Sequence, residues 1–182
     1  MRQKILLALS LLVVLAQAQG AKSGVERTAP NFYLKDLQGK SHFLNDYCGT
    51  KKVAYKKNEK NVVLLSFFAT WCQPCAAEYK ILEELAEAYY GKPVKFFMIN
   101  VKEQKEIVKR YAEKHGIKFP ILLDIYGVTS KRYQVTRLPR LFIITPEQTI
   151  AYDHTGFDAQ DALKEKLAAK VDSLLNTYWG SQ

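Results

Sequence analysis

Residues 62–75 read VVLLSFFATWCQPC, and this stretch decides the fold. Its first eight residues, 62–69, are rich in β-branched and aromatic side chains, so they predict a short buried strand. From Pro74 the apolar positions change to helical spacing, and proline suits the first turn of a helix. Glu78, Ile81, Leu82, Leu85 and Tyr89 recur at helical spacing, with Gly91 as a C-terminal cap. Two cysteines therefore lie where a strand passes into a helix.

That position favours redox chemistry at Cys72 and Cys75. A helix N-terminus carries partial positive charge and free N–H groups, which stabilise a thiolate. We therefore expect Cys72 to be the nucleophile, with its sulfur exposed, and Cys75 to be shielded and to resolve the mixed disulfide. The first cysteine of such pairs has a pKa of about 3.5 to 7, against about 8.5 for a free cysteine. Trp71 offers an apolar wall on which a partner protein can rest.

The chain has 182 residues, which suits one compact domain. Three cysteines do not form a disulfide framework. The net charge is +9, and five lysines at positions 51, 52, 56, 57 and 60 form part of the excess. A solvated loop explains them, although contact with an acidic partner or an anionic membrane surface stays open. No nucleic-acid-binding motif accompanies them.

The N-terminus predicts export. Arg2 and Lys4 precede an apolar run over residues 5–16, and Ala16-Gln17-Ala18 is a small-x-small cleavage site, so residues 1–18 read as a signal peptide. The run is shorter than the roughly 20 residues of a membrane-spanning helix, with an uncleaved anchor as the alternative. We expect a linker over 19–27, the domain over 28–176, a tail over 177–182, and a periplasmic or other extracytoplasmic location.

The remaining segments predict an α/β fold, a central mixed sheet flanked by helices and preceded by a β-hairpin. The hairpin joins residues 31–34 and 41–44, and a polar segment over 45–60 contains Cys48. A strand over 94–101 leads to a helix over 103–115 that carries Ile107, Val108, Tyr111 and Ala112 on one face and ends at Gly116. An apolar run (119–123), a brief helix (126–133) and a hairpin (141–144 with 149–152) follow. Asp158 caps a last helix with Leu163, Leu167, Val171 and Leu174 on one face.

The sequence resembles the thioredoxin superfamily, and more closely the exported thiol-disulfide oxidoreductases of the ResA/TlpA/CcmG type. The resemblance covers about residues 28–176. It is carried by residues 29–32, 67–78, 99–101, 119–124 and 138–144. It implies a thioredoxin-like fold and a cis peptide at Leu138-Pro139 facing the dithiol. Trp71, Pro74, Leu138 and Pro139 would then shape the substrate groove.

The resemblance also implies that Glu78 is a site carboxylate. Glu78 lies one helical turn after Cys75, so it can relay a proton to or from that thiol. The alternative is a solvated glutamate on the helix surface.

Three features depart from the family pattern. Ser66 stands where thioredoxins carry a buried aspartate, so that proton relay is missing. Arg140 follows the proline at a position that is usually small, and we expect it to add bulk and charge beside the groove. Cys48 is interpreted as a buried thiol, with an intermolecular link or a third redox partner as alternatives.

The function predicted is reduction of protein disulfides outside the cytoplasm, with no cofactor beyond the Cys72–Cys75 disulfide. Family analogy suggests a membrane thiol-electron donor and a part in cytochrome c maturation. A disulfide oxidase or isomerase is the alternative enzyme. A metal-binding protein is the alternative of another class, although His42, Cys48, His115 and His154 show no clustered spacing. A third class is a client-binding module without turnover. The sequence leaves the oligomeric state open.

Overall fold

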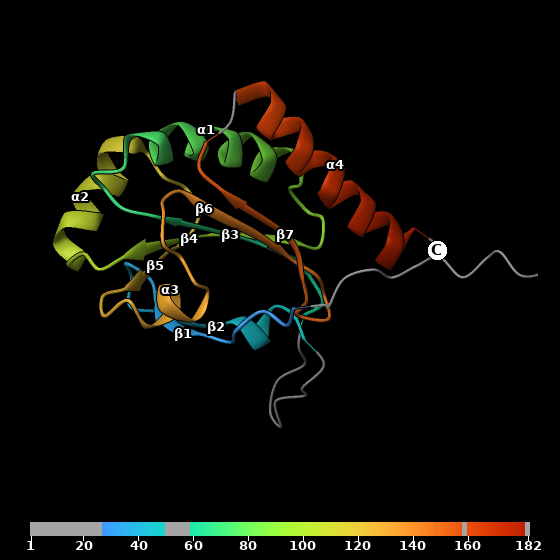
Figure 1. The fold of residues 1–182 in the computed structure, drawn as a ribbon, viewed down its shortest axis with the longest axis horizontal. Helices are drawn as coiled ribbons and strands as arrows, with labels where there is room; N and C mark the ends of the chain where they lie inside the picture. Colours follow the sequence, from blue (N-terminus) through green and yellow to red (C-terminus); the bar gives the residue numbers. More distant parts are fainter. Residues whose placement is uncertain (1–26, 50–58, 158–159, 181–182) are drawn as a thin grey trace, which may run out of the picture.

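The computed structural model describes residues 27–49, 59–157 and 160–180 (Figure 1). The predicted signal peptide, nearly all of the linker, most of the lysine-rich segment and Asp158 lie outside these residues. The elements in chain order are β1 Tyr33–Lys35, β2 Ser41–Phe43, the 3₁₀ turn η1 Leu44–Asp46, β3 Val62–Phe68, α1 Gln73–Ala88, β4 Val94–Val101, α2 Lys105–His115, β5 Ile121–Asp124, α3 Val128–Arg132, β6 Arg140–Ile144, β7 Ile150–Thr155 and α4 Gln160–Trp179.

The central sheet has the strand order β5-β4-β3-β6-β7, with β3 in the middle. β3, β4 and β5 run parallel, whereas β6 pairs antiparallel with both β3 and β7. β1 and β2 form the separate antiparallel hairpin at the N-terminus. The predicted mixed sheet with an N-terminal hairpin is confirmed. All seven residues of β3 are buried, as their apolar run predicts.

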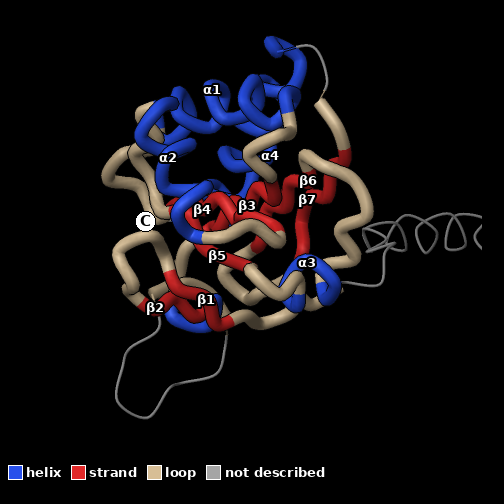
Figure 2. Tube along the Cα trace, turned by 90° about the vertical axis from the view of Figure 1, so that its left-hand side faces the viewer, coloured by secondary structure: helices blue, strands red, loops and turns tan. Residues whose placement is uncertain are grey.

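Both faces of the sheet are covered (Figures 1 and 2). Successive side chains of β3 point to opposite faces, so this strand contributes to the core on each side. Val62 and Leu64 pack toward α1 and α4. Val63, Leu65 and Phe67 pack toward the opposite layer, which holds the hairpin, η1 and the segment after α3. The predicted inner face of α4 is confirmed, because its four apolar residues Leu163, Leu167, Val171 and Leu174 are all buried.

The helices differ from the sequence predictions at several points. α2 begins at Lys105 rather than at Glu103, whose carboxylate bonds to Thr70 in the loop before α1 and to Asn100 of β4. Ile107 shares the predicted apolar face of α2 but is 41% exposed, since the buried stripe of α2 is centred on Val108. α4 continues to Trp179, beyond residue 176 at the predicted end of the domain. No helix among the described residues is long and apolar enough to cross a lipid bilayer.

Candidate active site

The two cysteines lie at the carboxyl end of β3. Cys72 is the N-cap residue of α1, and Cys75 lies in the first turn beside Pro74. A disulfide bond joins the two sulfurs at 2.02 Å. The predicted strand-to-helix junction is confirmed, and it gives Cys72 the helix position at which a thiolate is stabilised.

The dithiol is less exposed than the sequence suggested. Cys72 is 5% exposed and Cys75 is 1% exposed, so the prediction of an exposed Cys72 sulfur is wrong for the disulfide form. Both cysteines belong to an apolar cluster with Phe68 and Tyr79, against which Leu138 packs. Access to the disulfide is therefore confined, and it lies next to a tryptophan, Trp71, that is 75% exposed.

Glu78 is fully buried on the inner side of α1. The Ser66 hydroxyl of β3 donates a hydrogen bond to Glu78 Oε1 at 2.5 Å. Glu78 Oε2 has no hydrogen-bond partner among the described residues. Burial raises the pKa of Glu78 to about 7, and the Ser66 hydrogen bond opposes part of that rise. The alternative of a solvated surface glutamate is wrong.

Ser66 positions the Glu78 carboxyl group through this hydrogen bond. It occupies the strand position at which thioredoxins carry an aspartate, and it faces the same side of the sheet as α1. In this protein the buried carboxyl group comes from α1, as Glu78, and the strand supplies the hydroxyl that holds it. A buried carboxyl group therefore lies one helical turn after Cys75.

The peptide bond between Leu138 and Pro139 is cis, as the resemblance implied. Pro139 is buried, and its carbonyl accepts a hydrogen bond from the Gly156 N–H at 2.9 Å. Leu138 packs against the cluster that contains both cysteines. The loop before β6 thus lies close to the dithiol although it is more than 60 residues away in the chain.

The charge of Arg140 is paired within the protein, which the sequence did not predict. Its guanidinium contacts Asp153 at 2.6 Å, bonds to Thr155, and lies over the Phe142 ring. Its positive charge is paired within the β6–β7 hairpin.

Glu103 is a site residue that sequence reasoning missed. Its carboxylate accepts hydrogen bonds from the Thr70 N–H at 2.7 Å and the Thr70 hydroxyl at 2.5 Å, and a third from Asn100 Nδ2 at 2.7 Å. It therefore ties the loop before Cys72 to the end of β4. One feature of the sequence could have indicated this role: Glu103 lies two residues after the predicted strand 94–101, which follows the cysteine motif in the chain.

The third cysteine, Cys48, is shielded from solvent. Cys48 is fully buried, its S–H lies 3.8 Å from the Leu44 carbonyl oxygen, and burial followed by the charge of Glu147 raises its pKa to about 12. This confirms the interpretation as a buried thiol.

His42 is also engaged, with Asp36 Oδ2 at 2.9 Å and the Tyr47 hydroxyl at 2.7 Å. In the part of the chain that the structure describes, no group of three or more His, Cys, Asp or Glu side chains has the arrangement of a metal site.

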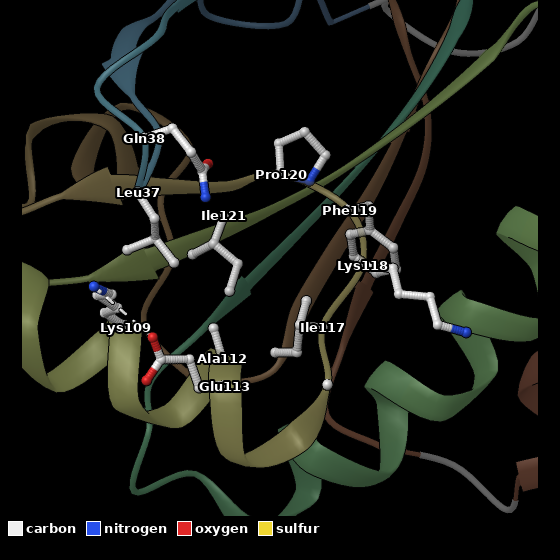
Figure 3. Close-up of a pocket in the computed structure, with 11 residues that line it drawn as sticks. Leu37, Gln38, Lys109, Ala112, Glu113, Ile117, Lys118, Phe119, Pro120 and Ile121 are labelled. Carbon is white, nitrogen blue, oxygen red and sulfur yellow. Dashed lines mark ion pairs between the residues drawn. The ribbon is translucent and has the colours of Figure 1, made fainter.

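A cavity of about 500 Å³ opens between α2 and the segment that leads into β5 (Figure 3). Ala112, Ile117 and Ile121 line its apolar side, and Leu37 closes it from the hairpin turn. An ion pair of 3.8 Å between Lys109 and Glu113 lies at its edge. None of the predicted site residues lines this cavity, although Ala112, Ile117 and Ile121 belong to or pack against the apolar cluster that contains both cysteines.

Comparison with known proteins identifies the family. The model of the AhpC/TSA family matches residues 25–153. The chain belongs to this family. It is 34% identical over 143 residues to the thiol-disulfide oxidoreductase ResA of Geobacillus thermodenitrificans, covering 79% of this chain and 76% of the relative. To ResA of Geobacillus kaustophilus it is 30% identical over 177 residues, covering 91% and 95%.

Solved structures show the same fold. StoA from Bacillus subtilis matches with a TM-score of 0.59 at 24% identity, covering 75% of this chain and 96% of StoA. The thioredoxin domain of a thiol-disulfide oxidoreductase from Bacteroides vulgatus matches with a TM-score of 0.66 at 21% identity, covering 81% and 98%. Together with the curated relatives, these matches confirm the expected resemblance. The chain is a thiol-disulfide oxidoreductase with a thioredoxin-like fold.

Proposed function

We propose that this enzyme reduces disulfide bonds in protein substrates outside the cytoplasm. The observation that carries the proposal is the pairing of Cys72 and Cys75 at the N-terminus of α1, one helical turn before the buried Glu78. The helix end favours the Cys72 thiolate. The carboxyl, with a pKa of about 7, exchanges protons near neutral pH.

The chemistry takes two steps. The Cys72 thiolate attacks one sulfur of the substrate disulfide, and the other substrate sulfur leaves as a thiolate that takes up a proton. Cys75 then gives its proton to the Glu78 carboxylate and attacks Cys72, which releases the second substrate sulfur. The substrate gains two electrons, and the enzyme is left with the Cys72–Cys75 disulfide seen in the structure.

Each turnover therefore requires a dithiol that returns two electrons to the enzyme. By the family resemblance we assign this part to a membrane-held thiol-electron donor, with apocytochrome c cysteines among the substrates. No cofactor is needed beyond the cysteine pair. The extracytoplasmic location is proposed from the signal-peptide pattern over residues 1–18.

The test is the reduction potential of Cys72–Cys75, measured by equilibration in defined thiol-disulfide buffers. We expect a value near about −270 mV, typical of a reductase. A value near about −120 mV would overturn the proposal and indicate a disulfide donor.

A second measurement tests the order of the two cysteines. A Cys75→Ser variant should accumulate a mixed disulfide with the substrate, whereas a Cys72→Ser variant should not. The reverse result would contradict the assignment of Cys72 as nucleophile.

A further inference from the structure

A second groove, of about 620 Å³, lies between the N-terminal hairpin and the β5–α3 region. Leu123 lines it from β5. Three apolar or aromatic side chains at its margin are largely in solvent: Tyr33 is 53% exposed, Tyr126 is 87% exposed and Val128 is 58% exposed. Such a gathering of exposed apolar side chains on one concave surface is typical of an interaction site.

The charge that this groove presents outward is positive. Lys35, Lys105 and Arg132 line it and are exposed, and none of them forms an ion pair with another described residue. The two carboxylates that line it are buried and used internally. Asp36 accepts hydrogen bonds from the Gln38 and Lys40 N–H groups and contacts His42; Asp124 accepts from the Thr129 and Ser130 N–H groups.

The groove is linked to the dithiol loop by the segment between β4 and α2. Within this segment Glu103 holds Thr70, two residues before Cys72, and Lys105, the first residue of α2, lines the groove. Figure 2 shows the hairpin and α3 on the same side of the sheet, and the groove is also lined by Leu123 and Asp124 at the carboxyl end of β5, which runs parallel to β4 and β3. A protein that reacts at Cys72 approaches this same end of the parallel strands.

We propose that this groove, lined by Lys35, Tyr126 and Lys105, binds an acidic segment of the protein whose disulfide reacts at Cys72. The segment would place carboxylates against the lysines and an aromatic or aliphatic side chain against Tyr126 and Val128. This inference rests on the proposed function, because it names the chemistry by which the oxidoreductase selects its partner. Charge complementarity decides the choice of occupant.

Binding is measured first, without redox chemistry. The probe is a fluorescein-labelled, cysteine-free peptide that alternates Asp or Glu with Phe or Leu, and its pair carries Asn or Gln in place of the acids. Oxidised wild-type protein should bind the acidic peptide about tenfold more tightly than the amide peptide at low salt, as two exposed ion pairs allow. The preference should shrink in about 0.5 M salt.

A Lys35→Glu/Lys105→Glu variant should lose that preference. Lys92→Glu is the control, because Lys92 is exposed in the turn between α1 and β4, at the opposite end of the sheet. Equal binding of the two peptides to the wild type, or an unchanged preference in the double variant, would overturn the proposal. Sedimentation provides one more test. If the protein forms a dimer that excludes the peptide and is lost when Tyr126 is replaced, the groove binds a second copy of the chain and the proposal is overturned.

Exchange is measured next, with the same two peptides carrying a short disulfide. Reduced wild-type protein should react faster with the acidic one, and the double variant should not distinguish them. If both peptides exchange at equal rates and the acidic peptide does not bind preferentially, the groove proposal is refuted and the proposed function stands. If the wild type binds the acidic peptide preferentially but exchanges with neither peptide, the groove proposal is supported and the proposed function is refuted.

Discussion

Replacing Glu78 by glutamine removes a buried carboxyl group at nearly constant volume, so it reports directly on where that group titrates. Burial raises the pKa of Glu78 from 4.5 to about 7. The folded state therefore keeps a proton that the unfolded state loses above pH 4.5. The stability associated with this group is fully present below pH 4.5 and is lost as the pH rises through about 7.

The magnitude follows from the size of the shift. Each pKa unit corresponds to about 1.36 kcal/mol, so the difference between 4.5 and about 7 amounts to about 3 kcal/mol. Relative to the wild type, Glu78→Gln should become progressively more stable from pH 4.5 to about 8, by about 3 kcal/mol in total. Most of the gain should appear below pH 7.

The assay is urea unfolding of the oxidised proteins at half-unit pH steps, because the disulfide removes thiol titration from the comparison. Glu84→Gln is the control, because it makes the same carboxyl-to-amide change at an exposed position of the same helix, where the carboxylate pairs with Lys164. Ser66→Ala removes the hydrogen bond that favours the carboxylate and should move the transition to higher pH. If the Glu78→Gln difference changes by less than about 1 kcal/mol across the range, Glu78 has an ordinary pKa and the proton-relay reasoning is refuted.

Three further outcomes are expected. Cys48 in the native oxidised protein should resist iodoacetamide at pH 8 and react only after unfolding in guanidinium, since its thiol is buried with a pKa of about 12; rapid native alkylation would contradict this. Leu167→Ala should lower the free energy of unfolding by about 2–5 kcal/mol in urea titrations, because the side chain is fully buried between α4 and the sheet, and a loss below about 1 kcal/mol would argue against that packing. Glu103→Ala should slow exchange of the reduced enzyme with a peptide disulfide about tenfold or more, whereas Glu103→Gln keeps one acceptor oxygen and should lose less; equal rates for both variants and the wild type would show that the Thr70 contacts do not position the dithiol.

Local patterns were enough to predict most of the elements. The eight-residue apolar run before Cys72 and the helical spacing after Pro74 placed the cysteines at a strand-to-helix junction, which is where the structure has them. The four apolar positions of α4 were predicted for the same reason, because hydrophobic periodicity is written along a single segment. The exposure of Ile107 and the ion pair of Arg140 were not predicted, because exposure and charge pairing depend on what packs against a segment.

The sequence by itself determined the elements, the dithiol and the family to which they point. The tertiary structure alone decided that Glu78 is buried against Ser66, that Glu103 holds the loop before Cys72, and that an exposed lysine-lined groove lies at the same edge of the sheet. Thr70 and Glu103 are 33 residues apart in the chain and meet only because β3 and β4 are parallel neighbours. Periodicity within a segment cannot specify contacts between segments, because these depend on strand order and register.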